Sequence, residues 1–149
     1  MQADLYSTNE NCDSIPALNT EIVNYTKNAM GKKVNTGECW DLAAEALKAN
    51  AAKWDGMYKF GNEVDPKAEC IFPGDIIQFK DVQVKYKKGN ATYTESMPHH
   101  TAIVYKVNGK GDYEIAHQNY SEFGRKVGVS SLALQNVTKG KLTFYRPVK

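Results

Sequence analysis

Long apolar runs, histidines and cysteines are all scarce in this chain of 149 residues. It contains no run of about 18 consecutive apolar residues, so a membrane-spanning helix is not expected. Residues 1–10 also lack an apolar run, so no signal peptide is expected within this sequence, although one could have been removed from a longer form. Internal repeats, low-complexity tracts and Pro/Ser-rich linkers are absent too. We therefore expect one domain over residues 1–149, with residues 1–13 as a flexible arm.

A strong excess of either charge is also missing. Nineteen Lys and Arg residues nearly balance 17 Asp and Glu residues, which gives a net charge of +2 and a pI of about 8.3. This mild basicity permits an anionic polymer as a partner, but it is far from the basic footprint of nucleic-acid-binding proteins. Nucleic acid is therefore not an expected partner.

The cysteine count is odd, because the chain has only Cys12, Cys39 and Cys70. At least one thiol is therefore unpaired. In an oxidising compartment we expect Cys12 to pair with Cys70, because Cys39 has another use. The alternative is three reduced thiols, two of which are simply buried.

The hydrophobic periodicity changes from helical to alternating along the chain. Two helices are predicted, over residues 16–30 and 38–52, and the second is rich in alanine. Strand-like segments follow at residues 75–80, 82–86, 92–95, 100–107, 113–119, 126–129 and 142–146. This order predicts an α+β fold in which N-terminal helices pack on one side of a curled antiparallel sheet.

Cys39 stands at the beginning of the second predicted helix. The unpaired N–H groups and the positive end of the dipole at a helix N-terminus favour a thiolate, which is the nucleophilic form of cysteine. The same N–H groups can bind the oxyanion that forms when a thiolate attacks a carbonyl group. A buried and inert cysteine is the alternative at this point.

A thiol nucleophile also needs a base, and the chain has only three histidines. His99 and His100 come directly before an apolar strand, and alternation places their side chains on opposite faces. We select His100 because it adjoins the apolar run. His117 and Asn119 share a face of the next strand, so either could hold the imidazole of His100 in orientation. The alternative for both strand ends is a solvated or merely polar position.

Four short motifs, in this order, resemble the CHAP and NlpC-type families of papain-like cysteine hydrolases. They are Gly-Glu-Cys-Trp-Asp-Leu-Ala at residues 37–43, Pro-Gly-Asp-Ile-Ile-Gln-Phe at 73–79, His-Thr-Ala-Ile-Val at 100–104 and Ile-Ala-His-Gln-Asn at 115–119. The resemblance covers residues 35–147. It implies a papain-like fold with a small barrel-like sheet, Cys39 as nucleophile and His100 as base.

The two families differ at the third catalytic position. CHAP domains usually have Glu there, with Asn two residues later, whereas NlpC-type domains often have His. His117 and Asn119 combine both patterns, and we favour His117 as the orienting residue with Asn119 as a helper or substitute. Glu38 precedes the nucleophile, where a carboxylate pointing inward would repel a thiolate, so we assign Glu38 no role in binding the oxyanion.

The Pro-Gly-Asp turn is expected to be structural, and Tyr25 could reach the site from the first helix.

The resemblance implies an amidase or peptidase that forms a thioester. Its expected substrate is peptidoglycan or another peptide that contains an amide, and its expected location is secreted or at the cell envelope, with a cytoplasmic location still open. No metal or organic cofactor is needed. Three alternatives are kept: a zinc site of Cys39, His99, His100 and His117, a non-catalytic binding module, and a deamidase or transglutaminase-type toxin that acts on a protein.

Overall fold

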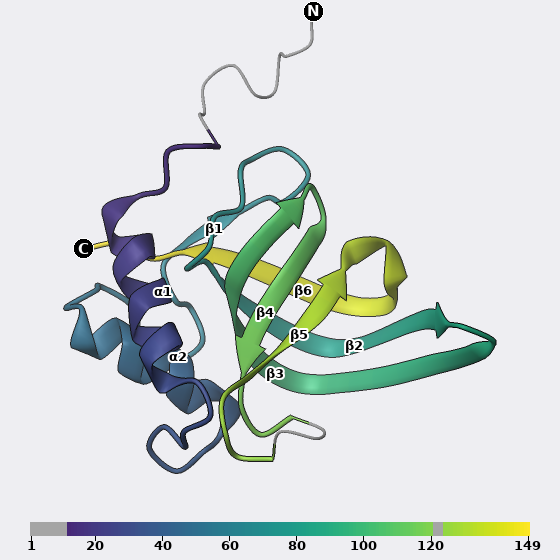
Figure 1. Ribbon diagram of the computed structural model, residues 1–149. Helices are drawn as coiled ribbons and strands as arrows, with labels where there is room; N and C mark the ends of the chain where they lie inside the picture. The colour runs from purple at the N-terminus through teal and green to yellow at the C-terminus, as the bar shows by residue number, and fades with distance from the viewer. Residues whose placement is uncertain (1–11, 121–123) are drawn as a thin grey trace, which may run out of the picture.

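The computed structural model describes residues 12–120 and 124–149 of the chain. It contains two α-helices and one six-stranded sheet, a mixed α/β architecture (Figure 1). The helices are α1 (Ala17–Ala29) and α2 (Cys39–Ala49), and a short 3-10 helix, η3, spans Leu134–Asn136. The strands are β1 (Asn62–Val64), β2 (Ile76–Lys88), β3 (Ala91–Gly109), β4 (Asp112–His117), β5 (Gly128–Ala133) and β6 (Val137–Arg146).

All strand pairs in the sheet are antiparallel, and the strand order is β1-β6-β2-β3-β4-β5. The sheet therefore has open edges at β1 and β5 and is not closed. The antiparallel sheet is as predicted, but the barrel-like closure is not formed. Closure would require β1 to pair with β5, and β1 has only three residues and pairs with β6 instead.

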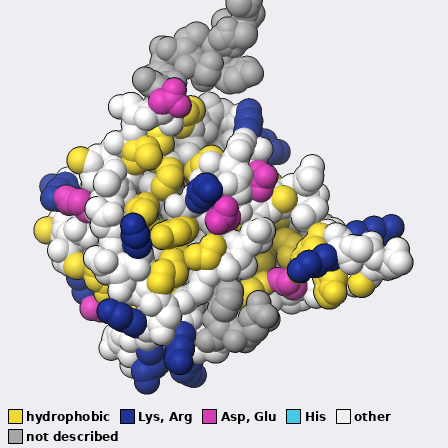
Figure 2. All heavy atoms as spheres, viewed as in Figure 1, with side chains coloured by type: hydrophobic (Ala, Val, Ile, Leu, Met, Phe, Trp, Pro, Cys, Tyr) yellow, Lys and Arg dark blue, Asp and Glu magenta, His cyan; other side chains and the backbone are white. Residues whose placement is uncertain are grey.

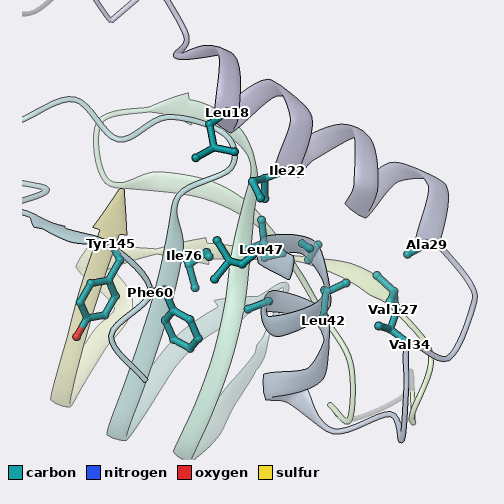
Figure 3. Close-up of a cluster of buried hydrophobic side chains, with 14 residues drawn as sticks. Leu18, Ile22, Ala29, Val34, Leu42, Leu47, Phe60, Ile76, Val127 and Tyr145 are labelled. Carbon is teal, nitrogen blue, oxygen red and sulfur yellow. The ribbon is translucent and has the colours of Figure 1, made fainter. Parts of the chain in front are cut away.

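Both helices lie on one side of the sheet, as Figure 1 shows, and a hydrophobic core fills the space between them. Leu18 and Ile22 of α1 and Leu47 of α2 point into this core, together with Ile76 of β2 (Figure 3). The helical spacing of these apolar residues is the pattern that a helix packed on a sheet requires. Burying each leucine or isoleucine contributes about 1.5–3 kcal/mol, so this cluster fixes α2 against the sheet.

The two longest strands were predicted as shorter, separate segments, and this prediction was wrong. Residues 75–80 and 82–86 belong to one strand, β2, and residues 92–95 and 100–107 belong to β3. Pro98 and Asp81 lie opposite one another, between the paired residues on either side, and Asp81 has a positive φ of 51°. The ladder absorbs this local irregularity and continues, so β2 and β3 form a long hairpin that projects beyond the other strands (Figure 1).

A disulfide joins Cys12 to Cys70, with a Cα–Cα separation of 5.5 Å. This is the pair that we expected for an oxidising compartment, and it leaves Cys39 as the free cysteine of the described residues. Most of the predicted N-terminal arm, residues 1–11, lies outside the described part of the chain. Cys12 itself is linked covalently to the body of the domain through Cys70.

Asp75 of the Pro-Gly-Asp turn is fully buried beside the first strand residues of β2. Its carboxylate accepts hydrogen bonds from Arg146, at 2.7 Å, from the side chain of Asn19 and from the backbone N–H of Phe72. The turn thus connects α1, β2 and β6. This geometry agrees with the structural role that we expected for the motif.

No helix in residues 12–120 and 124–149 is long and apolar enough to cross a membrane. Figure 2 shows one face of the molecule, on which Lys and Arg side chains are spread over the body and over the projecting β2–β3 hairpin. They do not gather into one patch on this face, in keeping with the small net charge of +2.

Candidate active site

Cys39 is the first residue of α2, as predicted, and the loop before it is tightly held. The buried carboxylate of Asp41 accepts hydrogen bonds from the backbone N–H groups of Thr36 and Glu38, at 3.2 and 3.1 Å. It also accepts one from the side chain of Asn35. A carboxylate in the first turn satisfies N–H groups that the helix leaves unpaired and is favoured by the helix dipole. The nucleophile therefore begins a well-capped helix.

A second anchor for this loop comes from the end of β4. Gln118 is fully buried, and its side-chain amide bonds both backbone groups of Val34. Nε2 donates to the carbonyl oxygen at 3.0 Å, and Oε1 accepts from the N–H at 3.1 Å. Nε2 also donates to the carbonyl oxygen of Glu38, at 2.9 Å. The residue next to His117 thus holds the peptide that enters Cys39.

Cys39 and His100 line the same cleft, which has a volume of about 680 Å³. Burial raises the pKa of the Cys39 thiol, and the carboxylate of Glu38 acts in the same direction. Backbone hydrogen bonds from Thr101, Trp40 and Cys39 itself partly offset that rise. The sulfur is therefore next to the peptide that follows His100, so the structure brings the two predicted residues together.

Hydrogen bonds connect His100 to two further side chains, those of His117 and Ser130. Nε2 of His100 lies 2.8 Å from Nδ1 of His117, and Nε2 of His117 lies 2.8 Å from Oγ of Ser130. The strands β3, β4 and β5 are consecutive in the sheet, so each contributes one member. With Nε2 of His100 taken by His117, Nδ1 is the ring nitrogen left for the thiol.

Both imidazoles of this chain are held in the neutral form. Burial, and to a smaller extent the neighbouring His99, lowers the pKa of His100 from 6.5 to about 4. Burial, followed by the charge of His100, lowers the pKa of His117 to about 3. Together with the raised pKa of Cys39, these shifts favour a neutral thiol beside a neutral imidazole at pH 7, rather than an ion pair.

Asn119 lies at the rim of the cleft and has a positive φ of 57°. Its side-chain amide donates to Glu38 Oε2, at 3.1 Å, and so faces away from the predicted contact with His100. Glu38 also pairs with Arg125 at 2.6 Å. The carboxylate is thus held at the surface by two partners, and the hydrogen bond to His100 comes from His117.

Of the other residues considered in the sequence, Tyr25 lies outside the site, and His99 lines the cleft without joining the hydrogen-bond chain. Tyr25 lines a separate depression with Glu45 and does not line the cleft of Cys39. The ring of His99 packs edge-on against Tyr58, with 4.7 Å between centroids. Within the described ranges no group of three or more His, Cys, Asp or Glu residues is arranged to hold a metal ion, so the four-ligand zinc site is not formed.

Sequence reasoning missed Ser130, Gln118 and Tyr58. Ser130 lies in a strand predicted to end at residue 129, and Gln118 entered the sequence analysis only as part of the motif at residues 115–119. Their roles depend on pairing between β4 and β5 and on contacts across 84 residues of sequence. Glutamine beside a predicted catalytic histidine was the one available signal, because a buried amide must find partners.

Comparison with known proteins agrees with this architecture. The altered inheritance of mitochondria protein 3 of the yeast Debaryomyces hansenii is 32% identical over 145 residues, which cover 85% of this chain. The chain spans only 15% of that protein's length. A solved structure described as Ly7917 with the hydrolyzing product of MDP has a TM-score of 0.51 at 18% identity, covering 87% of this chain and 63% of its own. That likeness concerns the fold alone.

Residues 16–149 match the family described as the AIM3/BBC1 cysteine proteinase-fold domain, so nearly the whole described chain is covered. The fold is accordingly a papain-like cysteine proteinase fold. The chain belongs to the family of AIM3/BBC1 cysteine proteinase-fold domains.

Proposed function

We propose that this chain is a cysteine hydrolase of the CHAP/NlpC type that cleaves amide bonds, with Cys39 as nucleophile and His100 as base. The observation that carries the proposal is that Cys39 and His100 line one cleft, where Nε2 of His100 lies 2.8 Å from Nδ1 of His117. A thiol, an imidazole and an orienting group are the three parts of a cysteine hydrolase site. His117 supplies the third part.

The reaction begins with a neutral pair. Nδ1 of His100 takes the thiol proton as the sulfur attacks the carbonyl carbon, and the imidazolium then gives that proton to the leaving amine. A thioester remains, and His100 removes a proton from the attacking water before returning it to the departing sulfur. Amide and water are thus converted into an acid and an amine, with the thiol restored.

His117 and Ser130 set the direction of the hydrogen bonds during this cycle. An imidazolium donates from both nitrogens, so Nε2 of His100 must donate to Nδ1 of His117 once His100 is charged. His117 is then the tautomer with its proton on Nε2, which donates to the hydroxyl oxygen of Ser130. The backbone N–H groups of Cys39 and Trp40, at the start of α2, are suited to hold the oxyanion.

The substrate and the location are parts of the same proposal. Peptidoglycan is one candidate, and the amide bonds of another peptide are the other. The Cys12–Cys70 disulfide favours a secreted or envelope-associated site of action, because disulfides persist in oxidising compartments. The mechanism needs no metal or organic cofactor.

A second candidate is a binding module that retains the fold without turnover. The directions of the pKa shifts favour it, because a raised thiol pKa and a lowered imidazole pKa both reduce the population of the reactive ion pair. In that case the cleft holds its ligand without breaking a bond.

Mass spectrometry after incubation separates the two candidates. Purified peptidoglycan fragments and a library of N-acetylated peptides are incubated with the wild-type chain, and the expected result is a new amine and a new acid from one bond. Cys39→Ala should give no product and an unchanged thermal transition. His100→Ala should slow alkylation of Cys39 by iodoacetamide, normalised to N-acetylcysteine. Product formation by Cys39→Ala would remove the nucleophile from the proposal, and binding without product would favour the second candidate.

A further inference from the structure

One wall of the cleft is aromatic. Trp40, Tyr58 and His99 all line it, next to Cys39. Tyr58 packs against His99 with 4.7 Å between ring centroids, and against Trp40 with 6.4 Å, in both cases edge to face. The three rings come from α2, the loop after it and β3, so the wall depends on the tertiary fold.

The loop that carries Tyr58 is held in place. The indole N–H of Trp40 donates to the carbonyl oxygen of Met57, at 2.6 Å, and the carboxylate of Asp55 accepts from the N–H groups of Met57 and Lys59. Trp40 itself packs on Trp54, with 5.6 Å between centroids. Tyr58 is thus presented by a structured turn rather than by a loose segment.

The wall also carries exposed apolar surface. Four large hydrophobic side chains among the described residues are exposed, and two of them, Met57 at 59% and Tyr58 at 40%, are adjacent in this loop. Tyr58 lines the cleft and Met57 precedes it in the same turn, so a ligand that enters the cleft can cover the exposed ring of Tyr58. Trp and Tyr rings are the side chains that most often anchor such contacts.

Other side chains that line the cleft are polar. They include Glu38, Asn119, Tyr120 and Glu95, whose polar groups bond to one another: Asn119 to Glu38, and Tyr120 to Glu95. The cleft at Cys39 therefore combines aromatic rings with polar groups that already have partners. Such a mixture of surroundings can select one side chain of the substrate.

We propose that Trp40, Tyr58 and His99 form a subsite for a hydrophobic side chain next to the amide bond that is cleaved. The inference rests on the proposed function of Cys39 and narrows its substrate class to peptides with an apolar or aromatic residue at that position. Tyr58 is the residue that determines this specificity, because its ring is exposed, lines the cleft and belongs to neither the nucleophile nor the base.

Matched electrophiles test the subsite without knowledge of the natural substrate. N-methyl, N-benzyl, N-(2-aminoethyl) and N-acetylglucosamine-linked chloroacetamides share one reactive carbon, from which the thiolate of Cys39 displaces chloride. Each second-order rate of alkylation, measured by mass spectrometry, is divided by the rate with N-acetylcysteine. The benzyl probe should react about tenfold or more faster than the methyl probe on this scale, the range that burial of one such side chain gives.

Tyr58→Ala should reduce this ratio to about one, and Tyr58→Phe should restore it. Tyr93→Ala is the matched control, because Tyr93 is also exposed, at 45%, but does not line the cleft. Faster reaction of the aminoethyl or sugar probe, or a benzyl preference that survives Tyr58→Ala, would overturn the subsite. Failure of the proposed function has a different signature: the methyl probe would then react equally with the wild type and His100→Ala.

Discussion

Nε2 of His100 lies 2.8 Å from Nδ1 of His117, although the two residues are 17 positions apart in the chain. The contact is possible because β3 and β4 pair antiparallel from the turn at residues 109–112 as far as Ile103 and Ala116, close to His100 and His117. An imidazole replaces the carboxylate or amide that could have filled the third position. A neutral imidazole orients its partner through one nitrogen, but it compensates a positive charge less than a carboxylate does.

His117→Ala should lower turnover, or the rate of Cys39 alkylation if turnover is absent, on the order of 100-fold, because His100 loses the group that fixes its tautomer. His117→Asn keeps a polar group able to accept from Nε2 of His100 and should retain more of the rate. Steady-state kinetics with thermal denaturation of each variant provide the measurement. Equal rates in the wild type and His117→Ala would show that His100 is oriented by something else.

Ser130→Ala removes the acceptor at the end of the hydrogen-bond chain, where the hydroxyl lies 2.8 Å from Nε2 of His117. The loss of one such hydrogen bond should slow the reaction about threefold to tenfold. Ser131→Ala is the matched control, because Ser131 follows Ser130 in the same strand but its side chain is exposed. A pH–rate profile separates this role from simple packing: the acid limb, set by His100, should move only in Ser130→Ala. Indistinguishable profiles would contradict the assignment.

Gln118→Met should misplace the nucleophile by removing three hydrogen bonds to Val34 and Glu38 while nearly preserving side-chain volume. The buried partners lose their bonds, so we expect unfolding to become easier by about 1–3 kcal/mol and Cys39 to be alkylated more slowly. Gln135→Met, at an exposed position, should change neither quantity. Urea denaturation and iodoacetamide kinetics provide the two readouts. A destabilised variant with an unchanged alkylation rate would limit Gln118 to a structural role.

The helices of this fold could be predicted closely, because their signals are local. Residues 16–30 and 38–52 were expected to be helical, and α1 and α2 occupy Ala17–Ala29 and Cys39–Ala49. Strand lengths were harder to predict, because Pro98 reads as a break. The long ladder between β2 and β3 tolerates it, since the paired strand is itself irregular at Asp81.

The same distinction between local and long-range signals applies to the residues of the site. Cys39, His100 and His117 could be selected from residue type, spacing and motif order, and the structure brings them together. The sequence favoured His117 over Asn119 but left Asn119 as a helper or substitute, because the position of Asn119 depends on the backbone turn after β4 ends. Ser130 was missed for a similar reason, since only the register between β4 and β5 places its hydroxyl beside His117.

The stability of the folded chain should fall as the pH decreases from about 6.5 to about 4. His100 has a folded-state pKa of about 4 against 6.5 when exposed, so the unfolded state binds a proton more readily over that interval. The stabilisation is fully present above pH 6.5 and is lost as the pH falls toward 4. For His100 alone the difference amounts to about 3 kcal/mol. His117 shifts in the same direction, but the two effects do not simply add, because the residues share a hydrogen bond.

Urea denaturation at intervals between pH 4 and pH 8 measures this dependence. His117→Gln, which cannot be protonated in this range, should flatten the profile between pH 6.5 and pH 4. His99→Gln is the control, because His99 is exposed and its replacement should leave most of the slope in place. Carboxylates begin to titrate at the lower end of the interval, and comparing variants at each pH removes their contribution. A wild-type stability that stays constant from pH 7 to pH 4.5 would mean that the two imidazoles are not buried in the neutral form. The neutral resting state of the proposed mechanism would then be wrong as well.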